Sequence, residues 1–257
     1  GLVRSAFYRG IIAAETGHVR EAVSRLSESA RRARNLGATA DDLNATQSLA
    51  GVLAESGRHR AALEAFIGLV PLIEGASRRT RGGFYNNLGW LLLQWAELHP
   101  EPILLDRAYD LFRAAIDPLS DAPLSLANVH TNLAAIGLAE GRLADAERHL
   151  ARAAHLDPQG DSFGHPYALL LEGQLALALG ELHRADTAFI VAQEVAEEAG
   201  GPSSDLVWRA LHGRGRAARA GGRRGAALAF MTDAHTRREA TVNATGVSRG
   251  RAPFLRQ

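Results

Sequence analysis

Histidine has the widest chemical range of any residue type in this chain, because imidazole binds transition metals and transfers protons near neutral pH. The ten histidines do not have the spacing of a metal site. His149 and His155 are six residues apart, which places them on different faces of a helix, and no His-Glu-x-x-His sequence occurs. Four others stand alone in the sequence: His130, His165, His183 and His212. We therefore predict no metal ion and no cofactor.

Carboxylates and serines also lack a catalytic pattern. Asp145 and Glu147 alternate with small and basic residues, which is typical of a solvated helix surface. Asp157 and Asp161 lie in a predicted turn, but the ligand order of a calcium loop is missing. No Gly-x-Ser-x-Gly sequence, which would mark a nucleophilic serine, is present. We assign no catalytic residue and predict that the chain is not an enzyme.

Two residue types are absent, and their absence excludes whole classes of site. The chain has no cysteine, so it contains no disulfide framework, thiolate nucleophile or cysteine-bound metal. All 29 basic residues are arginine, which excludes a lysine Schiff base and a phosphate-binding P-loop lysine. A cytoplasmic location fits a chain without disulfides.

The overall composition is that of a globular protein. Hydrophobic residues make up 46% of the chain and charged residues 22%, which is too apolar for a disordered tail. The formal net charge is +1, so the chain as a whole does not attract nucleic acid or a membrane surface. No stretch approaches the ~18 consecutive apolar residues of a membrane span.

An internal repeat is the main structural signal, and segment 127–158 shows it most completely. Seven of its residues stand at spacings typical of a helix–turn–helix unit: Leu133, Ala134, Gly141, Ala146, Leu150, Ala153 and Pro158. Small residues allow two helices to approach closely, glycine ends the first helix and proline stops the second. At these positions the segment resembles the tetratricopeptide repeat (TPR) family.

The same frame recurs along the chain around Gly17, Gly57, Gly180 and Gly222. A further copy contains Leu88 and Phe112 but carries about seven extra residues in its turn. The resemblance implies an all-α fold, a right-handed superhelical solenoid of about six TPR-like helix pairs over residues 1–240. The expected repeats are 3–37, 43–76, 82–120, 127–158, 166–200 and 208–240. Residues 241–257 are predicted to form a C-terminal tail or the start of a following region.

The turn glycines are about 39–45 residues apart, longer than the usual ~34 of a TPR. Repeats of this length resemble those of kinesin light chains, large ATP-binding transcription activators and bacterial caspase-like (CHAT) peptidases. Asn86-Asn87-Leu88-Gly89 and Thr131-Asn132-Leu133-Ala134 are similar to the Asn-Leu-Ala signature of the kinesin light-chain type. This resemblance implies a repeat subclass but no particular cargo. We also expect the chain to come from a bacterial protein.

The third repeat departs from the frame, because Ala96 replaces its turn glycine. Pro100 and Pro102 follow, and they predict an ordered, extended bulge over residues 96–106. Two interpretations stay open. The bulge is either a tolerated loop insertion or a functional element at one rim of the array.

The TPR resemblance also implies which residues face the concave groove. These are the partner-binding candidates: Asn44, Gln47, Asn86, Asn87, Trp90, Asn128, Thr131, Asn132, Tyr167, Gln174, Arg209 and Arg216. Six neighbours complete the set: Gln94, Leu138, Leu170, Leu177, His212 and Arg219. Amide side chains can hold a peptide backbone without reading its sequence, aromatic rings supply contact area, and arginines suit carboxylates. Trp90 is open to a second interpretation, which is contact between adjacent repeats.

The C-terminal end of the chain is basic. Residues 205–257 hold eleven arginines against three acidic residues. This end is a solvated basic surface, a docking site for an acidic partner segment or a nucleic-acid site. Poor interleaving with aromatic residues disfavours the nucleic-acid interpretation.

These features predict a module that binds a protein or peptide segment in the groove. The bound segment is expected to have an acidic end. The chain begins with glycine rather than methionine, which favours a piece of a longer protein. We therefore expect the sensor or regulatory arm of a larger signalling or peptidase protein. A free-standing TPR adaptor is the alternative. An enzyme built on a helical-repeat scaffold is a third hypothesis, because function depends on sites and not on folds.

Overall fold

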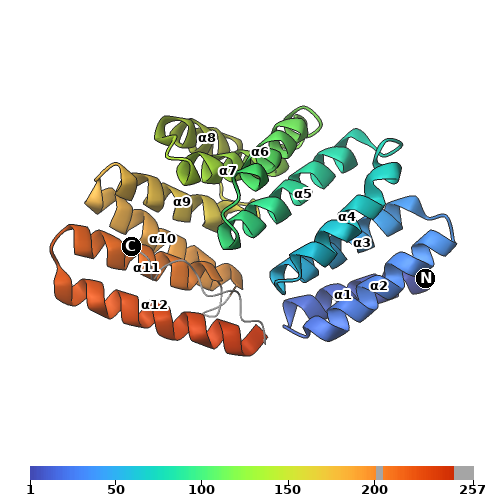
Figure 1. Cartoon of the computed structure of the whole chain (residues 1–257), viewed down its shortest axis with the longest axis horizontal. Helices are drawn as coiled ribbons and strands as arrows, with labels where there is room; N and C mark the ends of the chain where they lie inside the picture. The colour runs from blue at the N-terminus through green and yellow to red at the C-terminus, as the bar shows by residue number, and fades with distance from the viewer. Residues whose placement is uncertain (201–204, 246–257) are drawn as a thin grey trace. The chain divides into compact units, whose positions relative to one another are not determined.

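The computed structural model describes residues 1–200 and 205–245. Within these residues the chain forms twelve α-helices and no strand (Figure 1). In chain order they are α1 (Leu2–Glu15), α2 (Val19–Asn35), α3 (Thr39–Glu55), α4 (His59–Ile73), α5 (Arg78–Leu98), α6 (Pro102–Ile116), α7 (Pro123–Ala139), α8 (Leu143–Leu156), α9 (His165–Ala178), α10 (Leu182–Gly200), α11 (Asp205–Ala220) and α12 (Arg224–Thr245). The all-α class and the succession of TPR-like helix pairs are confirmed.

The helices belong to two compact units, Gly1–Leu119 with α1 to α6 and Ser120–Asn243 with α7 to α12. In each unit the first helices of successive pairs are neighbours. Thus α3 contacts α1 and α5 in one unit, and α9 contacts α7 and α11 in the other. The prediction of one continuous array over residues 1–240 stays a prediction. Residues 246–257 of the predicted tail lie outside the described residues.

Five turns between paired helices depend on the glycines that the repeat frame singled out. Gly17, Gly57, Gly141, Gly180 and Gly222 have φ values of 77°, 75°, 70°, 78° and 74°. This left-handed region is nearly strain-free for glycine and costly for residues with a Cβ atom. In the first turn, the residue after the glycine donates its backbone N–H across the helix end, at 2.7 Å to the Ala13 carbonyl. The sequence therefore predicted both the position and the geometry of these turns.

Small residues inside the helix pairs allow close packing, as the frame predicted. An ideal Cβ on Gly89 of α5 would lie 2.8 Å from Cε1 of Phe112 on α6. On Gly173 of α9, it would lie 2.6 Å from Cδ1 of Phe189 on α10. Both phenylalanines are fully buried. Each ring therefore occupies the space that a side chain on the facing helix would need.

The predicted bulge over residues 96–106 is wrong. Helix α5 continues for 21 residues to Leu98, and α6 begins at Pro102. Ala96 is therefore a buried helical residue rather than a turn residue. The extra residues therefore lengthen α5. Pro102 stands in the first turn of α6, where its missing backbone N–H costs nothing.

No helix within residues 1–200 and 205–245 is long and apolar enough to cross a membrane.

Candidate partner-binding surface

Three of the predicted amide residues meet on α3 and α5. Asn87 donates from Nδ2 to Oε1 of Gln47 at 3.1 Å, and Asn86 donates from Nδ2 to Oδ1 of Asn87 at 3.4 Å. Gln47 and Asn87 are 40 residues apart, so the contact joins two successive repeats. We call these three residues the amide chain. Because an amide offers two donors and an acceptor, Gln47 and Asn87 keep hydrogen-bonding capacity that these bonds do not use.

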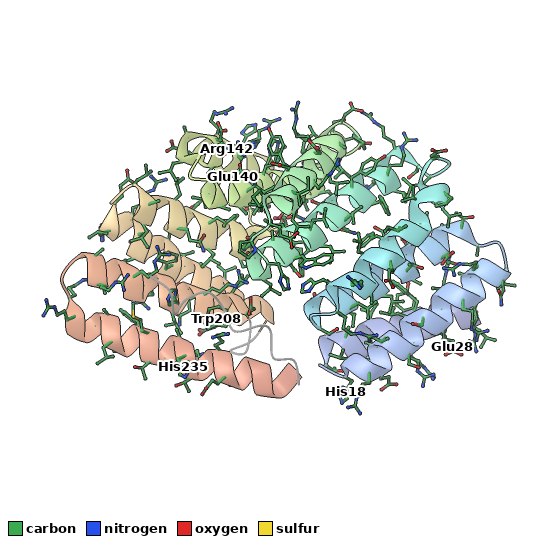
Figure 2. All side chains as sticks on the ribbon, viewed as in Figure 1. His18, Glu28, Glu140, Arg142, Trp208 and His235 are labelled. Atoms are coloured by element: carbon green, nitrogen blue, oxygen red, sulfur yellow. The ribbon has the colours of Figure 1, made fainter. Side chains whose placement is uncertain are left out.

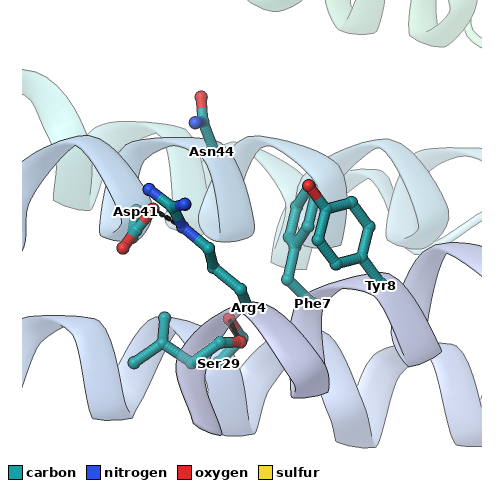
Figure 3. A pocket seen from close by; sticks show the side chains of 7 residues that line it. Arg4, Phe7, Tyr8, Ser29, Asp41 and Asn44 are labelled. Atoms are coloured by element: carbon teal, nitrogen blue, oxygen red, sulfur yellow. Dashed lines mark hydrogen bonds and ion pairs between the residues drawn. The ribbon is translucent and has the colours of Figure 1, made fainter. Parts of the chain in front are cut away.

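A hollow of about 310 Å³ lies beside the same face, between α1, α2 and α3 (Figure 3). Its wall is made by Val3, Arg4, Phe7, Tyr8, Ser29, Asp41 and Asn44. Arg4 extends across the opening toward Asp41, with 3.9 Å between Nε and Oδ1. Tyr8 is 61% exposed and packs edge-to-face against Phe7. The hollow therefore combines an aromatic wall with both signs of charge, next to the predicted residue Asn44.

Trp90 lies one helical turn after the amide chain on α5 and is half-buried. The exposed part of its side chain can contact a bound segment. Its partial burial is equally compatible with contact between repeats. The assignment of Trp90 to the partner-binding surface therefore stays a prediction.

The predicted residues on α7 have structural partners inside the second unit. Asn128 accepts a hydrogen bond at Oδ1 from the backbone N–H of Gly164, at 3.0 Å, and so anchors the loop before α9. Thr131 donates to the Ala127 carbonyl at 3.1 Å and is 3% exposed. Asn132 is 6% exposed. Thr131 and Asn132 thus present almost no surface, because α7 packs against both α8 and α9.

Helix α9 contributes Tyr167 and Gln174, both half-buried. Tyr167 packs against the apolar cluster that contains Leu170 and Phe189. Much of its ring therefore serves the core of the second unit. Gln174 lies two turns further along the helix and is partly exposed.

Helix α11 carries a row of basic groups along one face. Arg209, His212, Arg216 and Arg219 recur at helical spacing. Arg209 is held within the helix, with Nε 2.8 Å from Oδ2 of Asp205. Arg216 and Arg219 are exposed and form no ion pair among the described residues. Burial, and then these two arginines, lower the pKa of His212, so its imidazole is neutral at pH 7.

Three other arginines of the basic end pair with carboxylates within the second unit. Arg214 lies 3.1 Å from Oδ1 of Asp186, and Arg223 approaches the other oxygen of that carboxylate at 3.7 Å. Arg237 pairs with Glu197 and Asp233. Arg238 lies over the ring of Trp208, at 5.6 Å from its centroid (Figure 2 labels Trp208). The exposed positive charge of α11 is therefore concentrated at Arg216 and Arg219.

No protein-family model matches the sequence, and no curated protein matches it. Solved structures do. BtubC (BKLC) from P. vanneervenii is 17% identical, with a TM-score of 0.64 over 86% of this chain and 91% of that one. A Rap protein complexed with Competence and Sporulation Factor is 14% identical, with a TM-score of 0.72 over 94% of this chain and 66% of that one. A kinesin light chain-like protein of Podosopora anserina with nearly identical TPR-like repeats is 14% identical, with a TM-score of 0.54 over 78% and 96%. The chain is a TPR-like helical repeat protein.

The TPR-like frame contains a signal for the hollow that the predicted set omitted. Asn44 and Gln47 lie thirteen and ten residues before the turn glycine Gly57. In the first repeat, Arg4 and Phe7 stand at the same two distances before Gly17. Both residues line the hollow. Extending the frame to the first repeat would therefore have found this wall.

His130 stands alone in the sequence but has an imidazole partner in the fold. It lies on α7 with its Nδ1 atom 3.0 Å from Nδ1 of His149 on α8, so one imidazole donates to the other. Burial, then His149 and Arg152, lower the pKa of His130 to about 4. Burial and Arg148 also lower the pKa of His149. Both rings are neutral at pH 7.

The pairing escapes detection in the sequence because it depends on how α7 and α8 pack. The turn between these helices is itself held by Arg142, which pairs with Glu140 and, at 2.7 Å, with Asp145 (Figure 2). The described residues contain no group of three or more histidine and acidic side chains placed to hold a metal ion. The hydrogen bond between the two imidazoles joins α7 to α8.

Proposed function

We propose that this TPR-like chain is a protein-interaction module that holds a partner segment on the first helices of its pairs. The observation that carries the proposal is the amide chain of Gln47, Asn87 and Asn86, with the hollow beside Asn44. Spare amide groups can bond to a peptide backbone whatever its sequence, while a hollow receives a side chain. The likeness to a Rap protein complexed with Competence and Sporulation Factor supports a peptide as the partner.

The proposal for the second unit is an acidic end on the bound segment. Arg216 and Arg219 are exposed and lack ion pairs among the described residues, so carboxylates of a partner can reach them. A planar guanidinium binds a carboxylate with two parallel hydrogen bonds. Tyr167, Gln174 and Asn128 complete the proposed contact set on this unit. Thr131 and Asn132 are left out of it because they are buried.

Within this proposal the chain is the regulatory arm of a larger bacterial signalling or peptidase protein located in the cytoplasm. A free-standing adaptor is the alternative, and no catalytic role is proposed. Immunoprecipitation of the native protein followed by mass spectrometry separates the two. A native chain far heavier than 27.4 kDa supports the regulatory arm. A chain of about that mass with a stoichiometric companion supports the adaptor.

Selection from random peptides displayed on phage tests the binding surface directly. We expect the purified chain to enrich peptides whose affinity falls at least about tenfold in the double variant Gln47→Ala/Asn87→Ala, since two backbone-binding amides are lost. Asn35→Ala is the matched control, because Asn35 is an exposed amide at the end of the second helix of its pair. Equal affinity in the double variant and the control would contradict the proposed surface.

A further inference from the structure

Helix α4 has an apolar face that points away from its core. Its inner face contributes Ala62, Phe66, Leu69 and Ile73, all buried, to the core of the first unit. On the opposite side Ile67 is 58% exposed and Val70 is 50% exposed. Pro71, which is exposed, extends the same side one turn beyond Ile67. Leu63, one turn before Ile67, is half-buried and forms the border of this side, because it also packs against the core. We call Leu63, Ile67, Val70 and Pro71 the α4 stripe.

Three other second helices each expose one large hydrophobic residue among the described residues, namely Ile103 on α6, Val191 on α10 and Leu228 on α12, whereas α4 exposes two. Within α2 and α8 no large hydrophobic residue is exposed. Their outward faces carry ion pairs instead, such as Arg25 with Glu21 on α2 and Arg148 with Asp145 on α8. Two exposed aliphatic residues one turn apart on the second helix of a pair indicate an interaction surface.

Opposite charges flank the stripe symmetrically. Arg60 stands seven residues before Ile67 and Glu74 stands seven residues after it. Seven residues are two helical turns, so both charges lie on the face of Ile67. Both are exposed, and neither forms an ion pair among the described residues. Along the helix, this face therefore presents a basic residue, then apolar residues, then an acidic residue.

Two copies of this face are complementary in charge when the two helices run in opposite directions. When two copies of α4 pack antiparallel about a two-fold axis at Ile67, each Arg60 meets the Glu74 of the other copy and the two Ile67 side chains meet in the middle. Leu63 then faces Pro71, and Val70 faces the exposed Glu64. A parallel arrangement would oppose like charges at both ends.

We propose that the α4 stripe, with Arg60 and Glu74 at its ends, is a two-fold docking surface for a second copy of this chain. The proposal does not depend on the partner segment described above. The stripe lies on the second helix of a pair, whereas the amide chain lies on first helices. Variants that separate the two copies therefore leave peptide binding unchanged.

Sedimentation equilibrium of the 257-residue chain tests the proposal. We expect a reversible dimer of twice 27.4 kDa at concentrations up to on the order of 100 µM. Ile67→Asp gives a monomer with unchanged helical circular dichroism, because the replaced side chain is mostly exposed and a charge in an apolar interface is costly. A wild-type chain that stays monomeric throughout this range, or an Ile67→Asp dimer of unchanged affinity, overturns the proposal.

A charge exchange tests the antiparallel register. Arg60→Glu and Glu74→Arg each weaken the dimer by about tenfold, because each creates two like-charge contacts. The double variant Arg60→Glu/Glu74→Arg recovers most of the lost affinity. Arg107→Glu, the same charge change on an exposed residue of α6, leaves the dimer unchanged. A double variant as weak as the single variants overturns the proposed pairing.

Discussion

The contact between His130 and His149 shows what side chains of one helix pair can do for each other. Nδ1 of each ring approaches Nδ1 of the other at 3.0 Å, which requires that one nitrogen carries a proton and the other does not. A second proton on the pair would place two donors face to face. Both pKa values are lowered, which agrees with a neutral pair packed between α7 and α8.

We predict that acid destabilises the fold through this pair. The pKa of His130 is about 4 in the folded chain against 6.5 in the unfolded chain, so the unfolded chain binds the proton more readily between these values. Stability is therefore complete above about pH 6.5 and is lost as the pH falls toward 4. Because His130 is half-exposed, solvent screening limits the loss to about 1–2 kcal/mol.

Urea unfolding at several pH values between about 4.5 and 7.5 measures this loss. The difference in unfolding free energy between wild type and His130→Asn should shrink as the pH falls. His155→Asn is the control, because His155 is exposed on the same α8. Parallel pH profiles for wild type and His130→Asn would rule out the linkage.

Single residues of the candidate surface were predicted unevenly. Gln47, Asn86 and Asn87 were assigned from their repeat positions, and the fold brings them into one hydrogen-bonded chain. Thr131 and Asn132 were assigned in the same way but are buried, because repeat position does not reveal how closely the next pair covers a helix. The same gap hid the pairing of the two histidines.

At the scale of the helix pair, local patterns predicted well. A turn glycine and a small residue facing a large one are properties of one or two helical turns, so sequence spacing is enough to find them. The predicted bulge in the third repeat is wrong because a proline can begin a helix as well as interrupt one. In the structure Pro102 begins α6, and the preceding residues continue α5.

Two glycine substitutions should have opposite effects on stability. Gly89→Ala places a Cβ 2.8 Å from the buried ring of Phe112, so we expect a loss of about 1–3 kcal/mol. Gly51→Ala on α3 meets nothing within 4 Å, so its higher helix propensity should stabilise by up to about 1 kcal/mol. The midpoints of urea unfolding compare the two. A stabilised Gly89→Ala variant would show that the ring can move aside.

At the scale of the whole molecule, charge is balanced locally. The sequence predicted the near-zero net charge and the basic C-terminal end, since both are sums over residue types. It did not predict which arginines remain exposed, because Asp186 and Glu197 reach arginines that follow them by many residues. It also did not predict the two compact units, which depend on long-range contacts.

The exposed charge on α11 should bind polyanions in a pH-dependent manner. We expect poly-L-glutamate to bind the chain. The double variant Arg216→Gln/Arg219→Gln should weaken this binding about tenfold, because both guanidinium groups that bind carboxylates are lost. Arg223→Gln is the control, since Arg223 is also exposed but already faces Asp186.

A bound carboxylate offsets the arginines that lower the pKa of His212, so binding takes up a proton and strengthens as the pH falls from 7.5 to about 5.5.

Isothermal titration calorimetry at these pH values measures both effects. His212→Gln should abolish the pH dependence while keeping most of the affinity at pH 7.5, where His212 is neutral. Equal weakening by Arg223→Gln and by the α11 double variant would show non-specific attraction. Single-stranded DNA serves as the comparison ligand, and tighter binding of DNA than of poly-L-glutamate would favour a nucleic-acid partner over an acidic segment.

Within each unit, the contacts join helices that are one or two places apart in the chain. Such an arrangement has a mechanical consequence. Among the described residues, a tensile force applied at the two ends of a unit reaches each helix pair mainly through its neighbours. In an optical trap, a unit should therefore lengthen at low force in a series of small extensions, each the release of one helix pair, and recoil through the same steps when the force is relaxed.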